Sequence, residues 1–278
     1  MIERNIRVSR LSSILILLML AGCSSPSVSD NSDNAQQGST DKTVTETSSA
    51  TGGTDQTAPV TKKETVEATS PENAEVDRET NMALISASSR GDERAVKRLL
   101  EQGADVHARD ETGGTTPLVA AAYGNRLEVA RILIEAGADV NVKDETQQSA
   151  YLISTAEVGD DPRLLKLTLA NGANVRSLDS YNGTGLIRAA DRGYVDVVRE
   201  LLKTDIDVDH INNLGWTALL EAIILGDCDP RHTEVVRLLV EAGANVNLAD
   251  SNGVTPLQHA RELGCTEIAE ILENAGAT

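Results

Sequence analysis

The sequence predicts an all-α solenoid of about six similar repeats over residues 81–278, and three observations support this. The first is a short unit, Gly-Ala-(Asp/Asn)-Val, whose valines are 34, 35, 33 and 38 residues apart. The second is a pair of short apolar segments between successive units. The third is composition: the chain of 278 residues has no Phe and 2% aromatic residues, which favours small helices packed through Leu, Ile, Val and Ala. The unit lies at Gly103–Val106, Gly137–Val140, Gly172–Val175 and Gly243–Val246, and in degenerate form at Asp205–Val208.

The most regular repeat, residues 116–144, shows why each unit should form two helices. Thr116 can cap a helix with its hydroxyl, and Pro117 suits the first turn, where its missing N–H costs nothing. The apolar segments Leu118–Tyr123 and Leu127–Ile134 follow, separated by a short turn that contains Gly-Asn. The glycine of the recurring unit then takes the left-handed conformation that ends a helix.

This pattern resembles the ankyrin repeat, and the resemblance covers about residues 81–278. It implies a β-hairpin turn followed by two antiparallel helices in each unit. It also implies a concave face, formed by hairpin tips and inner helices, that binds other proteins. The residues expected to contact a partner there are Trp216, Tyr181, Asp191 and Arg192. Trp is common in binding hot spots, and the alternative for Trp216 is packing against neighbouring hairpins.

Two repeats depart from the regular pattern through long acidic turns. Repeat three contains Gly159-Asp160-Asp161-Pro162, and repeat five contains the segment Gly226–His232. A cation could bind such turns, but they lack the ligand spacing of a calcium loop, so we expect no metal site. In repeat three, Tyr151 replaces a leucine at a helix start and is predicted to be a core residue.

Cys228 and Cys265 lie in the turns between helices of two adjacent repeats. Packed helices are about 8–10 Å apart, and the long turn that carries Cys228 could fold over to reach the ~7 Å that a disulfide allows between Cα atoms. Three alternatives follow: a disulfide, two free thiols, or a metal site that adds His232. An exported protein reaches a compartment in which disulfides form, but two free thiols are the favoured expectation.

The N-terminus resembles a bacterial lipoprotein signal peptide. A basic segment, Met1–Arg10, precedes an apolar run that ends in Leu-Ala-Gly-Cys at Cys23. The run is ~15 Å long as a helix, half of a bilayer core, which suits a cleaved signal better than a membrane span. The resemblance implies removal of residues 1–22 and attachment of acyl chains, palmitate among them, to Cys23 for stable anchoring. Ser24, in place of an aspartate, favours the outer membrane, facing the periplasm.

Residues 23–80 are expected to be the lipidated cysteine and a disordered tether. Ser24 to Glu79 contains no aromatic residue, Leu or Ile and is rich in Ser, Thr, Asp and Glu. Such a segment cannot bury enough apolar surface to offset the entropy lost on ordering. The repeat domain is therefore expected to begin at residue 81.

The charge balance bears on the class of partner. The net charge is −18, and residues 1–22 carry Arg4, Arg7 and Arg10 against Glu3, so the chain from Cys23 onward is about −20. Phosphate backbones would be repelled, which argues against nucleic acid. A protein with a basic surface is the favoured partner; the alternative is that acidic faces only keep the solenoid soluble.

The sequence contains no motif of a reaction site, since it lacks GxGxxG, P-loop, HExxH and GxSxG patterns. Its four histidines fall in separate repeats, where hydrogen bonding along the hairpins is the expected role; they are His107, His210, His232 and His259. We therefore expect neither an enzyme nor a cofactor.

These observations predict a monomeric, membrane-anchored envelope lipoprotein whose solenoid binds another protein, as a scaffold or adaptor. One alternative is an immunity or inhibitor protein that neutralises a basic toxin or hydrolase. Another is an envelope enzyme whose site, for example in the acidic turns, carries no recognised motif. A third is a structural spacer in the cell wall.

Overall fold

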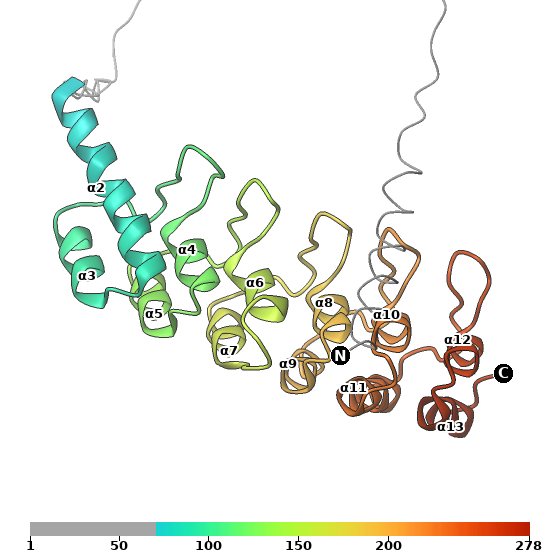
Figure 1. The fold of residues 1–278 in the computed structure, drawn as a ribbon. Helices are drawn as coiled ribbons and strands as arrows, with labels where there is room; N and C mark the ends of the chain where they lie inside the picture. The colour runs from blue at the N-terminus through green and yellow to red at the C-terminus, as the bar shows by residue number, and fades with distance from the viewer. Residues whose placement is uncertain (1–70) are drawn as a thin grey trace, which may run out of the picture. The chain divides into compact units, whose positions relative to one another are not determined.

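The computed structural model describes residues 71–278, and this part of the chain forms twelve helices in six antiparallel pairs (Figure 1). The pairs are α2 (Pro71–Arg90) with α3 (Glu93–Glu101), α4 (Pro117–Tyr123) with α5 (Leu127–Glu135), α6 (Ala150–Ala156) with α7 (Arg163–Ala170), α8 (Gly185–Asp191) with α9 (Val195–Leu201), α10 (Ala218–Leu225) with α11 (Pro230–Glu241), and α12 (Pro256–Leu263) with α13 (Thr266–Asn274). The expected signal peptide, Cys23 and residues 24–70 of the expected tether lie outside the described residues.

The helix pairs stack in two layers. Successive first helices pack on one another from α2 to α12, and most second helices pack on the second helix of the next repeat. The loops between repeats project from the layer of first helices (Figure 1). The predicted all-α solenoid of six repeats is confirmed. Within residues 71–278 no strand is recorded, and no helix is both long and apolar enough to cross a membrane.

Side-chain caps explain where five of the first helices begin. Each starts after a Ser or Thr whose hydroxyl accepts the backbone N–H three residues later; these caps are Thr116, Ser149, Thr184, Thr217 and Thr255. A cap of this kind contributes about 1 kcal/mol. The irregular starts of repeats three and four therefore keep the interaction that matters most for helix initiation.

The hairpin loops are held by side chains rather than by strand pairing. One Asp or Asn in each loop accepts two backbone N–H groups from the same loop; these residues are Asp110, Asp144, Asp179, Asn212 and Asp250. A backbone hydrogen bond closes each loop, as from the N–H of Asp179 to the carbonyl of Gly183 at 3.0 Å. These bonds satisfy loop amides and make the loops rigid.

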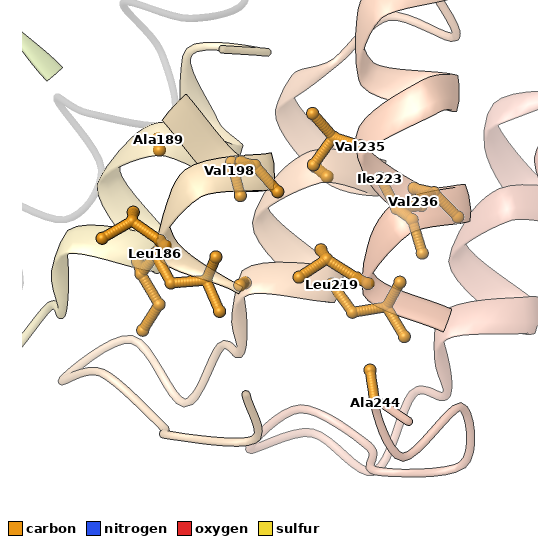
Figure 2. Close-up of a cluster of buried hydrophobic side chains, with 14 of the residues drawn as sticks. Leu186, Ala189, Val198, Leu219, Ile223, Val235, Val236 and Ala244 are labelled. Atoms are coloured by element: carbon orange, nitrogen blue, oxygen red, sulfur yellow. The ribbon is translucent and has the colours of Figure 1, made fainter. Parts of the chain in front are cut away.

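The core is continuous between repeats and consists almost wholly of small aliphatic side chains. Figure 2 shows part of it, where Leu186 and Val198 of repeat four lie beside Leu219 of repeat five. Tyr151 is fully buried, which confirms the prediction that it is a core residue. Its hydroxyl donates to the carbonyl of Val175 at 3.3 Å. A Cβ at Gly185 would lie 2.7 Å from that hydroxyl, so the large Tyr explains why repeat four has glycine at the second position of its helix start.

The first helix begins ten residues before residue 81, where the repeat domain is expected to start. Helix α2 begins at Pro71 and extends beyond the other first helices (Figure 1). Its packed C-terminal half nucleates the helix, and lengthening an existing helix costs little. Polar contacts hold the extension: Asn81 accepts the N–H of Asp105 at 2.7 Å, and Arg78 pairs with Glu111. Because these contacts are polar, no apolar periodicity marked them in the sequence.

Candidate interaction surface

The four residues predicted to bind a partner lie in repeats four and five, and we call them the central patch: Tyr181, Asp191, Arg192 and Trp216. Tyr181 is at a loop tip and is 64% exposed. Its N–H donates to Asp179 Oδ1 at 2.8 Å, and its carbonyl accepts the N–H of Asn213 from the next loop at 3.0 Å. The loop that carries the ring is thus fixed by one hydrogen bond within itself and by another to the loop of the next repeat.

Trp216 is partly buried and lies at the base of the repeat-five loop. Its N–H donates to Asn212 Oδ1 at 3.0 Å, and its carbonyl accepts the N–H of Asn212 at 3.0 Å. These two bonds fix the backbone that carries the indole. The residue is neither fully buried nor fully exposed, and its role in binding a partner stays a prediction.

Asp191 and Arg192 lie at the C-terminal end of α8. Asp191 is half-buried, and this burial raises the pKa of its carboxyl, while the positive charge of Arg192 opposes the shift. The two side chains approach to 3.6 Å. Arg192 is exposed, whereas Asp191 is in part covered by its surroundings.

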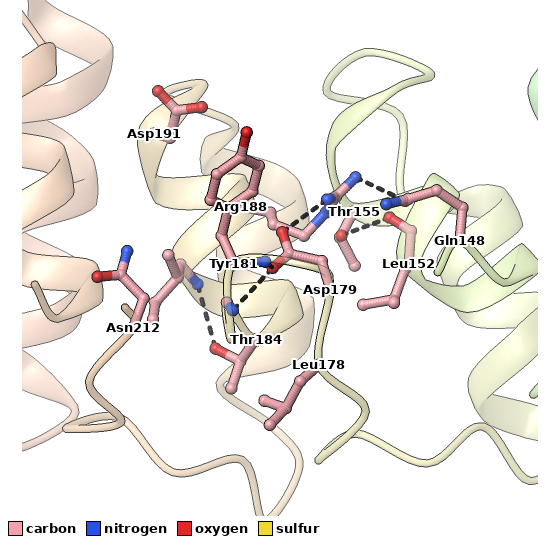
Figure 3. Close-up of polar contacts among 12 residues, drawn as sticks. Gln148, Leu152, Thr155, Leu178, Asp179, Tyr181, Thr184, Arg188, Asp191 and Asn212 are labelled. Carbon is pink, nitrogen blue, oxygen red and sulfur yellow. Dashed lines mark hydrogen bonds and ion pairs between the residues drawn. The ribbon is translucent and has the colours of Figure 1, made fainter. Parts of the chain in front are cut away.

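Arg188 is a functional candidate that the sequence did not single out. Its guanidinium donates to Asp179 Oδ2 at 2.9 Å and to Gln148 Oε1 at 3.0 Å (Figure 3). It also donates to Glu157 Oε1 at 3.1 Å. The side chain is 12% exposed, and its Nε has no hydrogen-bond partner within the described residues. This network joins repeats three and four beneath the central patch. The sequence feature that could have revealed Arg188 is an arginine at a position where the regular repeat has Ala120.

Glu221, on α10, is a second candidate that was missed. It is 5% exposed, and its Oε1 accepts the amide of Asn212 at 2.7 Å. Burial, with the charges of Asp191 and Asp179, raises its pKa to about 7, and the bond from Asn212 opposes that shift.

The loop residue opposite Glu221 is Asn, whereas the equivalent position in the other loops is Asp. An aspartate there would set two carboxylates against each other. The loops of repeats four and six instead pair an Asp with a cationic or neutral donor, Arg188 in one case and His259 in the other at 3.1 Å. The Asn at this position can be read from the sequence. It indicates that the loop is adapted to the carboxyl group of Glu221.

The long acidic turns, considered above as sites for a cation or for catalysis, serve structural roles. Asp160 Oδ1 accepts the N–H groups of Asp196 and Val197, at 2.8 and 3.1 Å, at the start of α9 in the next repeat. Asp161 pairs with Arg163 at 2.6 Å. The carboxylates of this turn are thus already used for capping and ion pairing.

The turn of repeat five is organised in a similar way. Asp229 caps α11, accepting the N–H groups of Arg231 and His232 at 2.7 and 3.0 Å. The ring of His232 contacts Asp229 Oδ2 at 2.7 Å and the carbonyl of Asp191 at 3.0 Å. Across residues 71–278, no three His, Cys, Asp or Glu side chains are grouped as metal ligands.

Cys228 and Cys265 are joined by a disulfide in the structure, with Cα atoms 5.2 Å apart. Cys228 is exposed in the long turn, and Cys265 is buried at the N-cap of α13. His232 lies in the same turn, but its ring is bound to Asp229 and to repeat four.

Comparison with known proteins agrees with this architecture. The family described as "Ankyrin repeats (3 copies)" matches residues 58–144 and 152–248. Over 194 residues, the chain is 40% identical to the ankyrin repeat protein YahD of Escherichia coli K12, spanning 69% of this chain and 95% of that protein. An ankyrin repeat domain from Acinetobacter baumannii AYE is 48% identical, with a TM-score of 0.66 over 70% of this chain and 98% of that domain.

The chain is also similar to one chain of a complex from Bdellovibrio bacteriovorus, that of the predatory endopeptidase Bd0816 with immunity protein Bd3460. The identity is 26% and the TM-score 0.60, over 69% of this chain and 97% of that one. The family match, the repeat geometry and the identity to YahD lead to one conclusion: the chain belongs to the ankyrin repeat family.

Proposed function

We propose that this protein is a lipid-anchored protein of the bacterial cell envelope whose ankyrin solenoid binds another protein through the central patch. Ankyrin repeat domains are typical protein-interaction scaffolds, which supports the binding role. The Leu-Ala-Gly-Cys sequence ending at Cys23 supports the anchor. The observation that carries the choice of surface is the exposed ring of Tyr181, held on a rigid loop that is hydrogen-bonded to the loop before Trp216.

The partner is expected to present a basic surface. Asp191 is a partly exposed carboxylate of the central patch, and Arg188 is already bound to carboxylates of its own neighbourhood. A lysine or arginine from the partner would pair with the carboxylate of Asp191 and contact the aromatic faces. In this proposal the protein acts by binding, as a monomer, and neither catalyses a reaction nor holds a cofactor.

The binding role is tested by crosslinking the full chain in intact cells and identifying the captured partner. Tyr181→Ala and Trp216→Ala should each reduce capture by roughly tenfold or more, the loss expected of hot-spot residues. Tyr123→Ala is the matched control, because Tyr123 is also exposed, at 46%, but lies in repeat two. A partner captured equally by all three variants would show that the central patch is not the binding surface.

The anchor is tested separately. Cys23→Ser should move the protein from the membrane fraction to the soluble fraction, and mass spectrometry of the wild-type protein should find acyl chains on Cys23. Membrane association that survives the substitution would contradict a lipid anchor at this residue, without bearing on the binding surface.

A second candidate function, an immunity or inhibitor protein, is favoured by the similarity to a chain of the endopeptidase–immunity complex. Here the partner would be a basic hydrolase, and binding would weaken steeply with increasing salt. The discriminating measurement is the hydrolytic activity of the captured partner. Inhibition on binding would support this function, and full activity in the complex would support a scaffold.

A further inference from the structure

The turns between the two helices of each repeat lie along one side of the stack, and we call this side the turn edge. At this edge, neighbouring repeats are joined by direct contacts. Arg126 Nε donates to the carbonyl of Ser89 at 3.1 Å and joins repeats one and two. Asp160 joins repeats three and four, and His232 joins repeats four and five. The last contact, between repeats five and six, is the Cys228–Cys265 disulfide.

The turn of repeat five is shaped to carry Cys228 to this position. Asp227 and Cys228 both adopt positive φ, 50° and 56°, a conformation that residues other than glycine seldom take. Gly226 lies so close to α10 that a Cβ would come within 2.3 Å of the carbonyl of Ala222. Asp229 then caps α11 and anchors the far end of the turn. Both ends of the turn are thus fixed, and its exposed tip covers the buried Cys265.

The disulfide contributes more to holding repeat six on the stack than a single contact contributes to holding an internal repeat. It packs only on repeat five, through α10 with α12 and α11 with α13, whereas an internal repeat has a neighbour on each side. End repeats of a solenoid therefore open most easily. A covalent bond across a separation of 37 residues limits the open state, because the opened repeat cannot move away from the stack.

We propose that the Cys228–Cys265 bond is a redox-controlled lock on repeat six. When the bond is formed, α12 and α13 are held on the stack. When it is reduced, they open and expose the apolar side chains of repeat five that they cover, among them Ile223 and Val236. The oxidant is an external disulfide: the two thiols lose two protons and two electrons as the Sγ–Sγ bond forms, and the oxidant is reduced to two thiols.

This inference does not depend on the proposed partner. It does agree with export, since a disulfide persists outside the reducing cytoplasm. A chain still in the cytoplasm would have an open last repeat, and the stack would close after the chain reached an oxidising compartment.

The test is hydrogen exchange of the full chain in a Cys23→Ser background, which removes the third thiol of the sequence. Reduction with a phosphine should speed exchange in α12 and α13 by roughly 100-fold, as expected from the loss of a cross-link over a loop of this length. Helices α2 and α3 are the internal control, because they lie at the opposite end and contain no cysteine; their exchange should not change.

Two variants separate the bond from the fold. Cys228→Ser changes an exposed side chain. Without reductant, hydrogen exchange in α12 and α13 of this variant should be as fast as in the reduced parent. Adding reductant should not change it. Cys265→Ser should behave in the same way, and if it fails to fold, Cys228→Ser still decides the matter. Two alkylatable thiols in the parent without reductant, or equal exchange before and after reduction, would overturn the proposal.

Discussion

At the side of the stack where the loops between repeats project, Asp179, Asn212 and Asp250 each bind the first helix of their own repeat. At the turn edge, Asp160 and Cys228 each bind the repeat that follows. The first kind of contact gives each loop a fixed position within its repeat, and so fixes the exposed tip that a partner would meet. The second kind sets how one repeat lies on the next.

The difference shows that acidic residues of similar appearance in the sequence have separate roles. The carboxylates of the long turns are used by helix amides and by Arg163, so they stabilise the stack. Glu221, in the first turn of α10, and Asp191, at the end of α8, have raised pKa values instead, because burial disfavours their charged forms. Changes in the loops between repeats should therefore affect stability and binding together, and changes in the two long acidic turns should affect stability alone.

The largest effect is expected for Arg188→Ala, which leaves Asp179 and Glu157 without their cation. Breaking a nearly buried ion pair by removing one partner costs about 3 kcal/mol, and denaturant unfolding would measure it. The matched control is Arg199→Ala, because Arg199 is 48% exposed and pairs with Asp196 and Glu234 on the outer helices. Its loss should stay below about 1 kcal/mol. Equal losses would show that the Arg188 network does not stabilise the loop side.

A smaller, pH-dependent effect is expected for Glu221→Gln. The pKa of Glu221 is raised from 4.5 to about 7, so the folded state favours its protonated form. The stability that this protonation provides is complete below pH 4.5 and is lost as the pH rises through 7. Glutamine does not ionise, so the variant does not lose this stability as the pH rises. Its free energy of unfolding should exceed that of the wild type by on the order of 2 kcal/mol at pH 8, with the difference disappearing near pH 5.

Asn212→Asp is the opposite change at the same contact. It places a second carboxylate against Glu221, with Asp191 and Asp179 already near. Unfolding at pH 8 should become easier than in the wild type, and less so at pH 5, where protonation relieves the repulsion. A pH profile of stability for Asn212→Asp that matches the wild type would mean that the two side chains do not interact in solution.

The smallest effect is expected for Asp160→Ala at the turn edge. The substitution removes the carboxylate oxygen that accepts two N–H groups at the start of α9. This loss should lower the free energy of unfolding by about 1 kcal/mol. Asp161→Ala, in the same turn, removes an exposed ion pair and should change the unfolding free energy by a few tenths of a kcal/mol. Partner capture should be the same for both variants and for the wild type. Reduced capture would show that the turn edge also contributes to binding.

Much of the fold was predictable because ankyrin repeats are local. Each unit carries its own helix cap and its own apolar residues. A Thr-Pro pair such as Thr116-Pro117 therefore predicts the start of a helix wherever it recurs. Tyr151 was recognised as a core residue because it replaces a leucine at a known position. The start of α2 at Pro71 was not predicted, because its stabilising contacts are polar and reach residues about 24 to 33 positions away.

The candidate site was predictable only in part. Tyr181 and Trp216 were found from their loop positions, which the repeat pattern defines. Arg188 was not, since its partners come from two repeats and no local pattern brings them together. The sequence by itself determined the repeat, its helices and the prediction of a lipid anchor at Cys23, because short-range patterns encode all three. Only the tertiary structure decided which acidic residues cap helices and which lie buried with raised pKa values, since burial and charge depend on neighbours that stacking brings together.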